Sequence, residues 1–552
     1  MATNEEVRTL PHFSRGPSML DRERSIASRG FNRWLVPPAA LAVHLSIGMA
    51  YGFSVFWLPL SRAIGIHEPV QCADIGFIER VVSTRCDWPV SMLGWTYTLF
   101  FVFLGSSAAL FGKWLEHAGP RKAGFVAAIC WCGGLLISAL GVYVHQIWLL
   151  WLGAGVIGGV GLGLGYISPV STLIKWFPDH RGVATGLAIM GFGGGAMIGA
   201  PLADRLMNFF ATEHSIGVWQ TFVTMSAIYF VAMMLGAFGY RLPPAGWQPA
   251  ARAAQQPKSL VTSAHVDANE AIRTPQFWLL WGVLCLNVSA GIGVIGMASP
   301  MLQEVFGGQL IGVPSRLGEL NDAQRIEVAT IAAAFAGLIS LFNIAGRIMW
   351  ASASDILGRK LTYTVFFLLG FALYTSVPIA GEAGRIALFV GIVCAILTMY
   401  GGGFATVPAY LADLFGTQQV GAIHGRLLTA WSVAGVLGPV LVNYIREYQL
   451  RQGVPAHDAY NFTMHVLAGM LIFGLICNLL IRPVDAKHHM TKDQVAQDSA
   501  TVQSDRINAI SYDTSDAAVS PRGLLIMAWT AIAIPLAWGV WITLSKSLAL
   551  FR

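Results

Sequence analysis

Charged residues are scarce in this sequence. Asp, Glu, Lys and Arg make up 12% of its 552 residues, whereas hydrophobic residues make up 55% and the mean hydropathy is +0.59. Soluble globular proteins usually contain about 25% charged residues. This deficit excludes a soluble globular protein of this length and predicts a polytopic membrane protein.

Residue patterns that indicate catalysis or metal binding are also missing. None of the seven cysteines belongs to a CxxC motif or a His/Cys cluster, which argues against a metal site. The glycine run 191–195 lacks the preceding strand that a nucleotide site requires. No cluster of carboxylates and no Ser/His constellation faces one cavity, so a membrane enzyme is disfavoured and no cofactor is expected.

Long apolar runs are abundant. A helix needs about 20 apolar residues to cross a bilayer, and thirteen runs are long enough. These runs are residues 34–60, 90–112, 123–143, 148–173, 183–210, 218–240, 275–299, 328–351, 361–381, 386–411, 426–446, 462–481 and 523–544. The predicted fold class is an all-α membrane protein.

Polar segments divide these runs into larger units. The predicted order is a basic tail 1–33, a six-helix half 34–240, a linker 241–274, a second six-helix half 275–481, a polar linker 482–522 and a thirteenth helix 523–544. The purpose of the thirteenth helix cannot be predicted from its residues, which include Pro535 and no charge.

Basic residues fix the expected orientation. Lys113, Arg121, Lys360 and other basic residues lie in connections on the same side as the tail 1–33. The positive-inside rule places that side in the cytoplasm, here of a bacterial inner membrane. The tail is expected to remain cytoplasmic and not to be a cleaved signal peptide. The net charge of +6 then reflects loops beside anionic lipid and requires no nucleic acid partner.

The first outer loop carries two cysteines, Cys72 and Cys86. The other five lie in apolar runs and are interpreted as small core residues. An outer loop is a compartment in which a disulfide persists, so a Cys72–Cys86 bridge is expected, with two free thiols as the alternative.

An internal repeat relates the two halves. The loop GKWLEHAGPRK begins at Gly112, and the loop ASASDILGRK begins at Ala351. Alignment of Gly119 with Gly358, an offset of 239, places Glu116 on Asp355. Two parallel six-helix halves are typical of transporters in which one half rocks against the other around a site at their interface.

Arg347 is the most informative single residue, because it is a cation inside the apolar run 328–351. It lies eight residues before Asp355, which marks the membrane surface, or ~12 Å along a helix. That distance places it near the bilayer midplane, where an ionised side chain indicates a substrate path and an anion is its natural partner. The alternative is that Arg347 snorkels to the surface or braces the following loop.

The two loops resemble the signature loop of the major facilitator superfamily, with gating residues Glu116, Gly119, Arg121, Asp355, Gly358 and Arg359. Blocks beginning at Asn32, Gly163 and Asn343 are similar to the oxalate/formate antiporter family within it. The match covers residues 32 to about 481 and includes the ProAspHisArgGly passage at 178–182. The resemblance implies the major facilitator fold and alternating access.

The resemblance also implies a substrate pocket. Arg347 would bind the substrate carboxylate with its planar guanidinium. Pocket aromatics of the family fall on Tyr51, Tyr166, Phe192, Tyr400 and Phe404. Tyr400 and Phe404 are four residues apart and share one helix face. Taken singly, such aromatic residues are often only packing.

One departure from the family pattern concerns charge. The family has a second cation, a lysine, in span eleven, where this chain has Trp431. The repeat offset makes Phe192 and Trp431 equivalent, so they are expected to clamp the substrate. Burial of a dianion beside one arginine leaves an uncompensated charge, which favours a monocarboxylate. Asn343 and Arg347 resemble the Asp/Arg pair of proton-coupled monocarboxylate transporters, with an amide in place of the acid.

The expected function is therefore secondary active transport of a small monocarboxylate of the lactate, pyruvate or formate type, by a monomer. His44, seven residues before Tyr51, is a candidate proton carrier if it is not simply hydrogen-bonded packing. An oxalate/formate antiporter that exchanges a counter-anion is the alternative, and a membrane receptor or sensor is a more distant one.

Overall fold

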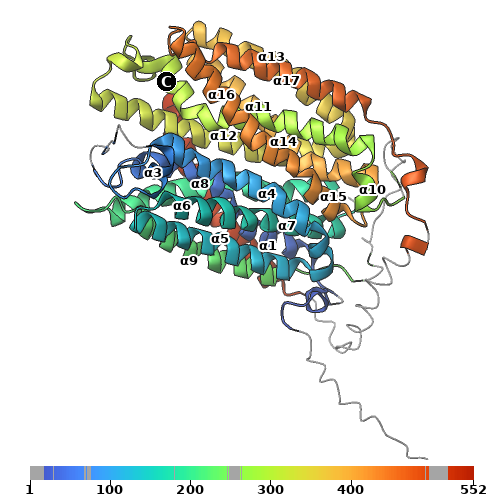
Figure 1. The fold of residues 1–552 in the computed structure, drawn as a ribbon. Coiled ribbons are helices and arrows are strands. Elements are labelled where there is room, and N and C mark those ends of the chain that lie inside the picture. Colours follow the sequence, from blue (N-terminus) through green and yellow to red (C-terminus); the bar gives the residue numbers. More distant parts are fainter. Residues whose placement is uncertain are drawn as a thin grey trace, which may run out of the picture.

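The computed structural model describes residues 18–28, 30–66, 70, 72, 76–178, 181–244, 247, 262, 264–491, 493–495 and 520–551. This part of the chain is built from helices arranged as two bundles side by side (Figure 1). The first half contains α1 (Val36–Ile47), η3 (Gly48–Phe56), α2 (Trp57–Leu60), α3 (Phe77–Val82), α4 (Val90–Ala118), α5 (Pro120–Tyr143), α6 (Ile147–Leu150), η4 (Trp151–Gly158), α7 (Gly159–Trp176), α8 (Arg181–Phe210) and α9 (Val218–Gly239).

The second half and the connecting segments follow in the chain. The second half contains α11 (Pro275–Phe306), η5 (Gly307–Ile311), η6 (Leu317–Glu319), α12 (Asp322–Leu357), α13 (Arg359–Glu382), α14 (Ile386–Phe415), α15 (Val420–Leu427), α16 (Thr429–Arg451) and α17 (Asn461–Leu480). Outside the halves are η1 (Arg22–Ser25), η2 (Arg33–Leu35), α10 (Ala268–Ala271), η7 (Ala486–His488), α19 (Arg522–Ser547) and η8 (Leu548–Phe551).

Twelve segments of the described chain are long and apolar enough to cross a membrane, and each matches a predicted run. The one remaining predicted run, 183–210, forms the 30-residue helix α8, which packs against α1 and α12. The predicted class of all-α membrane protein is therefore confirmed.

The first, fourth and eleventh predicted spans each differ from a single regular α-helix; in the fourth, the wider turns of η4 separate α6 from α7. The first changes from α1 to the tighter turns of η3 at Gly48, where a Cβ atom would meet the backbone of Phe192. The eleventh begins with α15 at Val420, six residues before the predicted start at Arg426, because the polar residue His424 lowers the apolar character of this first turn.

Helices of opposite halves pack along two seams. In one, α4 lies against α15 and α16; in the other, α8 lies against α12 and α14. At the second seam a Cβ on Gly186 would lie 2.9 Å from the carbonyl oxygen of Arg347. The absence of a side chain at Gly186 therefore lets α8 approach α12 closely at the level of the arginine.

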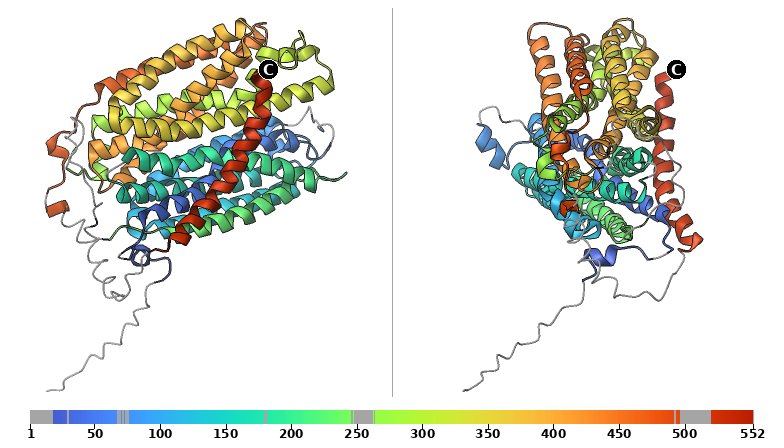
Figure 2. Two further views of the ribbon diagram at one scale, coloured as in Figure 1. Left: turned by 180° about the vertical axis from the view of Figure 1, so that it is seen from behind. Right: turned by 90° about the vertical axis from the view of Figure 1, so that its right-hand side faces the viewer.

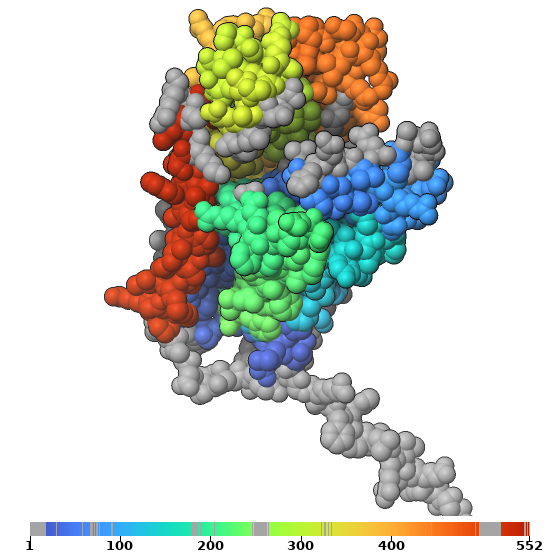
Figure 3. All heavy atoms as spheres, turned by 90° about the vertical axis from the view of Figure 1, so that its left-hand side faces the viewer, coloured from blue at the N-terminus to red at the C-terminus, as the bar shows by residue number. Residues whose placement is uncertain are grey.

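The last long helix, α19, lies on the outside of the bundle and crosses both halves (Figure 2). Only 6% of its most apolar window is buried. It contacts α1 and α8 of the first half and α12 of the second. Figure 3 shows it as a ridge along one edge of the molecule.

The first outer loop is held by covalent and polar contacts. Cys72 and Cys86 form a disulfide. The next residue, Asp87, accepts backbone hydrogen bonds from Ile64 and Val70 at 2.7 and 2.8 Å. The ring of His145 lies 2.9 Å from the Cys86 carbonyl oxygen, and burial lowers the pKa of this histidine. The loop is thus attached to the α5–α6 connection.

We expect alkylation under oxidising conditions to miss both Cys72 and Cys86, and to reach both after reduction. The bridge lies outside the spans, so a water-soluble maleimide has access once it is reduced. Peptide mass mapping provides the measurement, and the buried Cys132 serves as the internal control because it should react in neither state. Labelling of both loop cysteines before reduction would contradict the bridge.

Candidate functional site

Arg347 lies on α12 at the interface between the halves and is completely buried. Its Nε donates to Oδ1 of Asn343 at 3.1 Å, and its Nη1 donates to the carbonyl oxygen of Ile189 on α8 at 3.0 Å. Its Nη2 has no hydrogen-bond partner among the residues that the structure describes. Within the described residues no carboxylate forms an ion pair with Arg347. The guanidinium therefore bridges two halves while its charge stays uncompensated.

The aromatic residues predicted for the pocket meet in one buried cluster. Trp431 on α16 is its centre, with ring centroids 5.2 Å from both Phe192 on α8 and Tyr166 on α7, and 4.3 Å from Phe404 on α14. The rings of Phe192 and Trp431, equivalent through the repeat, therefore touch across the interface. Two of the four helices come from each half, so this cluster exists only when the halves are packed together.

Tyr51 and Tyr400 join the halves by a hydrogen bond. Their hydroxyl oxygens are 2.8 Å apart, between η3 of one half and α14 of the other. Tyr400 and Phe404 share one face of α14, with centroids 5.3 Å apart. The guanidinium carbon of Arg347 lies 5.6 Å from the Phe404 ring, within the range of a cation–π interaction. The predicted residues thus surround the arginine.

Several buried polar groups of this region lack partners. The Tyr166 hydroxyl, the indole Nε1 of Trp431, the amide Nδ2 of Asn287 on α11 and the ring Nε2 of His424 on α15 form no hydrogen bond. A buried group left in this condition costs roughly 1–3 kcal/mol. The indole nitrogen of Trp431 and the amide nitrogen of Asn287 can only donate, so each of these two unpaired groups could bind an acceptor atom.

Asn287 and His424 are missing from the residues predicted by sequence. Each is a polar side chain within a predicted span or the turn before it, which is the signal that could have identified them. His44, which was predicted, is completely buried, and its Nε2 lies 3.2 Å from the Tyr166 carbonyl oxygen. The centroids of the His44 and Tyr166 rings are 5.4 Å apart. This contact keeps His44 beside the cluster.

The predicted gating loops each contain an ion pair. In the first half, Lys175 at the end of α7 pairs with Glu116 at 2.5 Å, and Ser171 donates to the same carboxylate at 3.1 Å. Arg121 donates instead to the Met19 carbonyl oxygen. Gly119 has a φ of 84°, which allows the sharp turn between α4 and α5.

The loop of the second half uses a different pattern. Arg359 pairs with Asp355 at 2.6 Å and with Asp413 of α14 at 3.1 Å. Gly358 has a φ of 91°, similar to the 84° of Gly119, its equivalent in the repeat. In both halves the loop after the second span is therefore joined to the end of the fourth. Asp179 and His180 of the ProAspHisArgGly passage lie outside the described residues.

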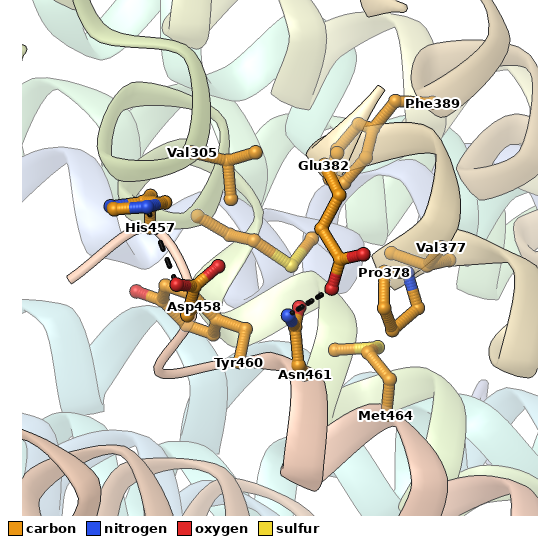
Figure 4. A pocket seen from close by; sticks show the side chains of 12 residues that line it. Val305, Val377, Pro378, Glu382, Phe389, His457, Asp458, Tyr460, Asn461 and Met464 are labelled. Carbon is orange, nitrogen blue, oxygen red and sulfur yellow. Dashed lines mark hydrogen bonds and ion pairs between the residues drawn. The ribbon is translucent and has the colours of Figure 1, made fainter. Parts of the chain in front are cut away.

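A separate hollow is lined by the ends of α11 and α13 and the start of α17, away from the gating loop at the start of α13. Figure 4 shows the side chains that line it. Its volume is about 30 Å³, and Glu382 accepts a hydrogen bond from Asn461 in its wall. The hollow itself has room for water only, but it adjoins a wider surface depression of about 1360 Å³ that shares Glu382 and Asn461 with it.

Two repeated six-helix halves that enclose a buried polar site define a membrane transporter. The family model of the Major Facilitator Superfamily matches residues 27–439 and 317–551, and the chain belongs to this superfamily. It is a multi-pass integral membrane protein and not an enzyme.

Known proteins with a similar sequence include the oxalate:formate antiporter of Oxalobacter formigenes. It is 24% identical over 74% of this chain and 83% of its own length. Apicoplast pyruvate carrier 1 of Toxoplasma gondii is 22% identical over 89% of this chain and 97% of its own. The solved structure of the proton:xylose symporter XylE covers 81% of this chain and 95% of its own, with a TM-score of 0.55 and 14% identity, which supports the fold.

The Glu116–Lys175 pair leads to a prediction about the gating loop. A Cβ on Gly421 of α15 would contact the Glu116 carboxylate, so the pair lies at the seam between the halves. Glu116→Gln should weaken a charge-assisted interaction by about 1 kcal/mol and raise the open fraction about fivefold. The measurement is the maleimide labelling rate of Ala422→Cys, which is 2% exposed in the closed seam.

The exposed Glu447–Arg451 pair provides the matched control, because Glu447→Gln removes an equivalent charge far from the seam. An equal labelling rate in the Glu116 variant and the parent would show that the pair does not hold the loop closed.

Proposed function

We propose that this protein is a secondary active transporter of small monocarboxylates of the lactate, pyruvate or formate type, working by alternating access. The observation that carries the proposal is the buried guanidinium of Arg347 with a free Nη2 and no carboxylate partner in the described chain. An unpaired buried charge costs several kcal/mol, and an anionic substrate is the partner that would offset this cost.

The geometry of the guanidinium suits one carboxylate. Asn343 and Ile189 occupy Nε and one hydrogen of Nη1. Both Nη2 hydrogens and one Nη1 hydrogen remain, and they are the donors that a carboxylate would accept. The uncharged donors of Tyr166 and Trp431 stand in the same aromatic cluster and are suited to a carbonyl or hydroxyl oxygen of the substrate.

The charge count favours a monoanion. Trp431 stands where the oxalate/formate family has a lysine, and its indole is fully buried among other rings. Arg347 alone neutralises one negative charge. The relatives include one named as a pyruvate carrier and one named as an oxalate:formate antiporter, which supports a small carboxylate as substrate.

Oxalate/formate exchange is the second candidate. The unpaired donors of Asn287 and Trp431 favour it, because neutral donors could bind a second carboxylate without a second cation. His44, beside Tyr166, is the proposed proton carrier if transport is coupled to protons rather than to a counter-anion. We further propose a monomer in a bacterial inner membrane with the N-terminus in the cytoplasm.

Arg347→Ala should abolish carboxylate uptake while the amount of protein in the membrane is unchanged. Arg347→Lys should restore little, since an ammonium lacks the two-pronged geometry. Counterflow of labelled pyruvate, lactate, formate and oxalate into liposomes, with and without a pH gradient, provides the measurement. A receptor or sensor would bind substrate without accumulating it, so accumulation by the parent protein also tests that alternative.

Arg451→Ala is the control for loss of an arginine, because its side chain is 73% exposed and pairs only with Glu447 on its own helix turn. It should transport at the parent rate. Ordinary saturation kinetics in Arg347→Ala would remove this arginine from the site.

Trp431→Lys should increase the preference for oxalate over lactate, because the second carboxylate gains a charged partner. Lactate transport should fall through loss of ring packing and through an unpaired ammonium. Rates must be compared across pH, since desolvation favours a neutral lysine and would mask the switch. Trp431→Phe, which keeps a ring without adding charge, should leave the preference unchanged. An unaltered lactate-to-oxalate ratio in a folded lysine variant at every pH would mean that residue 431 does not face the substrate.

A further inference from the structure

The thirteenth helix, α19, contacts the first half at its beginning and along its middle. At its beginning, Trp529 donates to the Trp34 carbonyl oxygen at 3.1 Å, and the Ser520 hydroxyl accepts from the backbone of Asn32 at 3.1 Å. Further along, the Trp538 ring lies 5.1 Å from the guanidinium carbon of Arg205 on α8. These polar contacts connect α19 to the segment before α1, at the end of the first half that faces the basic connections, and to α8 within the first half.

The middle of α19 passes directly behind the candidate site. A Cβ on Gly193 of α8 would lie 3.0 Å from Nε of Arg347, and one on the next residue, Gly194, would lie 3.5 Å from Leu536 of α19. One turn later, a Cβ on Gly539 would lie 3.2 Å from Ile198. The helix therefore packs closely on α8 at the level of the arginine.

The far end of α19 crosses to the second half. Thr543 is 5% exposed, and its side chain lies 3.2 Å from the position of a Cβ on Gly337 of α12. The following turn, η8, contacts α12 and α14, and its Leu550 is buried. Figure 2 shows the resulting diagonal course, from one end of the first half to the opposite end of the second.

This diagonal course matters because the two halves move. In transporters of this architecture the halves rock around a central site, so the largest displacement occurs far from it. Gly337 precedes Arg347 by ten residues on the same helix, or ~15 Å. The contact with Thr543 therefore joins the halves where rocking separates them, whereas the contacts with Gly194 and Ile198 lie within one packing unit with α8.

We propose that α19 is a strap: it moves with the first half, and its contact with Gly337 and its η8 turn hold the outer end of the second half until rocking releases them. Release in each cycle is then a step of transport, and the strength of this contact sets the balance between the held and released states. The proposal rests on membership of the transporter superfamily and not on the identity of the substrate.

A disulfide across the contact tests the strap. The Cβ of residue 337 would lie 3.7 Å from that of Thr543, within the range of 3.5–4.5 Å that a disulfide accepts. In the double variant Gly337→Cys/Thr543→Cys, oxidation should lower the turnover of labelled pyruvate at least about tenfold, and reduction should restore it. The parent protein, oxidised and reduced in parallel, reports any contribution of the Cys72–Cys86 bridge.

The matched control links α19 to the first half instead. In Ile198→Cys/Gly539→Cys a Cβ on residue 539 would lie 3.2 Å from Cγ1 of Ile198, and α8 and α19 are proposed to move together. Oxidation should therefore leave turnover within about twofold of the reduced protein. Parent-like turnover in the fully oxidised 337/543 pair, or failure of that pair to cross-link, would overturn the strap. Arrest by the control pair would do so as well, because α19 would then not move with the first half.

A second measurement needs no substrate and remains valid if the parent transports none of the carboxylates tested. Spin labels at Glu213→Cys and Arg385→Cys report the separation of outer loops from opposite halves. Gly337→Leu should displace Thr543 and enlarge the long-distance population at least about threefold. Gly469→Leu, where a Cβ meets no atom within 4 Å, is the control and should not change it. An identical distance distribution in the Gly337 variant and the parent would contradict the strap.

Discussion

The buried, uncompensated charge of Arg347 is the constraint on which the rest of the structure depends. A guanidinium in the middle of a membrane protein is stable only if protein groups accept its hydrogen bonds in place of water. Here Asn343 supplies one acceptor from the same helix, and Ile189 supplies another from the opposite half. The charge therefore stabilises contact between the halves while one nitrogen remains available to an anion.

The close approach of α8 and α12 follows from the same requirement. A carbonyl of α8 reaches Arg347 only because Gly186 and Gly193 place no side chain between the helices. The aromatic cluster then fills the space around the guanidinium with large rings that exclude water. Exclusion of water strengthens the attraction between the arginine and a carboxylate, because the effective dielectric constant is low. The packing that brings α8 to α12 therefore also creates the low-dielectric surroundings of the guanidinium.

The two halves share a repeat but differ in their ion pairs and in the charge of the candidate site. Glu116 and Asp355 occupy equivalent positions, yet the first pairs with Lys175 alone, whereas the second shares Arg359 with Asp413. Phe192 and Trp431 are equivalent as well, and both contribute rings to one cluster. Arg347 has no equivalent cation, since the position 239 residues earlier is Ala108. The repeat supplies the two-fold scaffold, and single substitutions give the site its charge.

The sequence by itself determined the membrane class and the thirteen helices, and it singled out Arg347 as a candidate, because long apolar runs and a lone cation within one are local features of the chain. It also placed the aromatic residues on their helices through the family resemblance. Contacts between the halves could not be read in this way. Three contacts join residues that are far apart in the chain: the Tyr51–Tyr400 hydrogen bond, the hydrogen bond from Arg347 to Ile189, and the packing of Thr543 against Gly337. The unpaired nitrogens of Asn287 and His424 likewise follow from tertiary packing and not from the local sequence. Hydrogen-bond satisfaction and helix crossing depend on packing across the whole bundle, which only the tertiary structure decides.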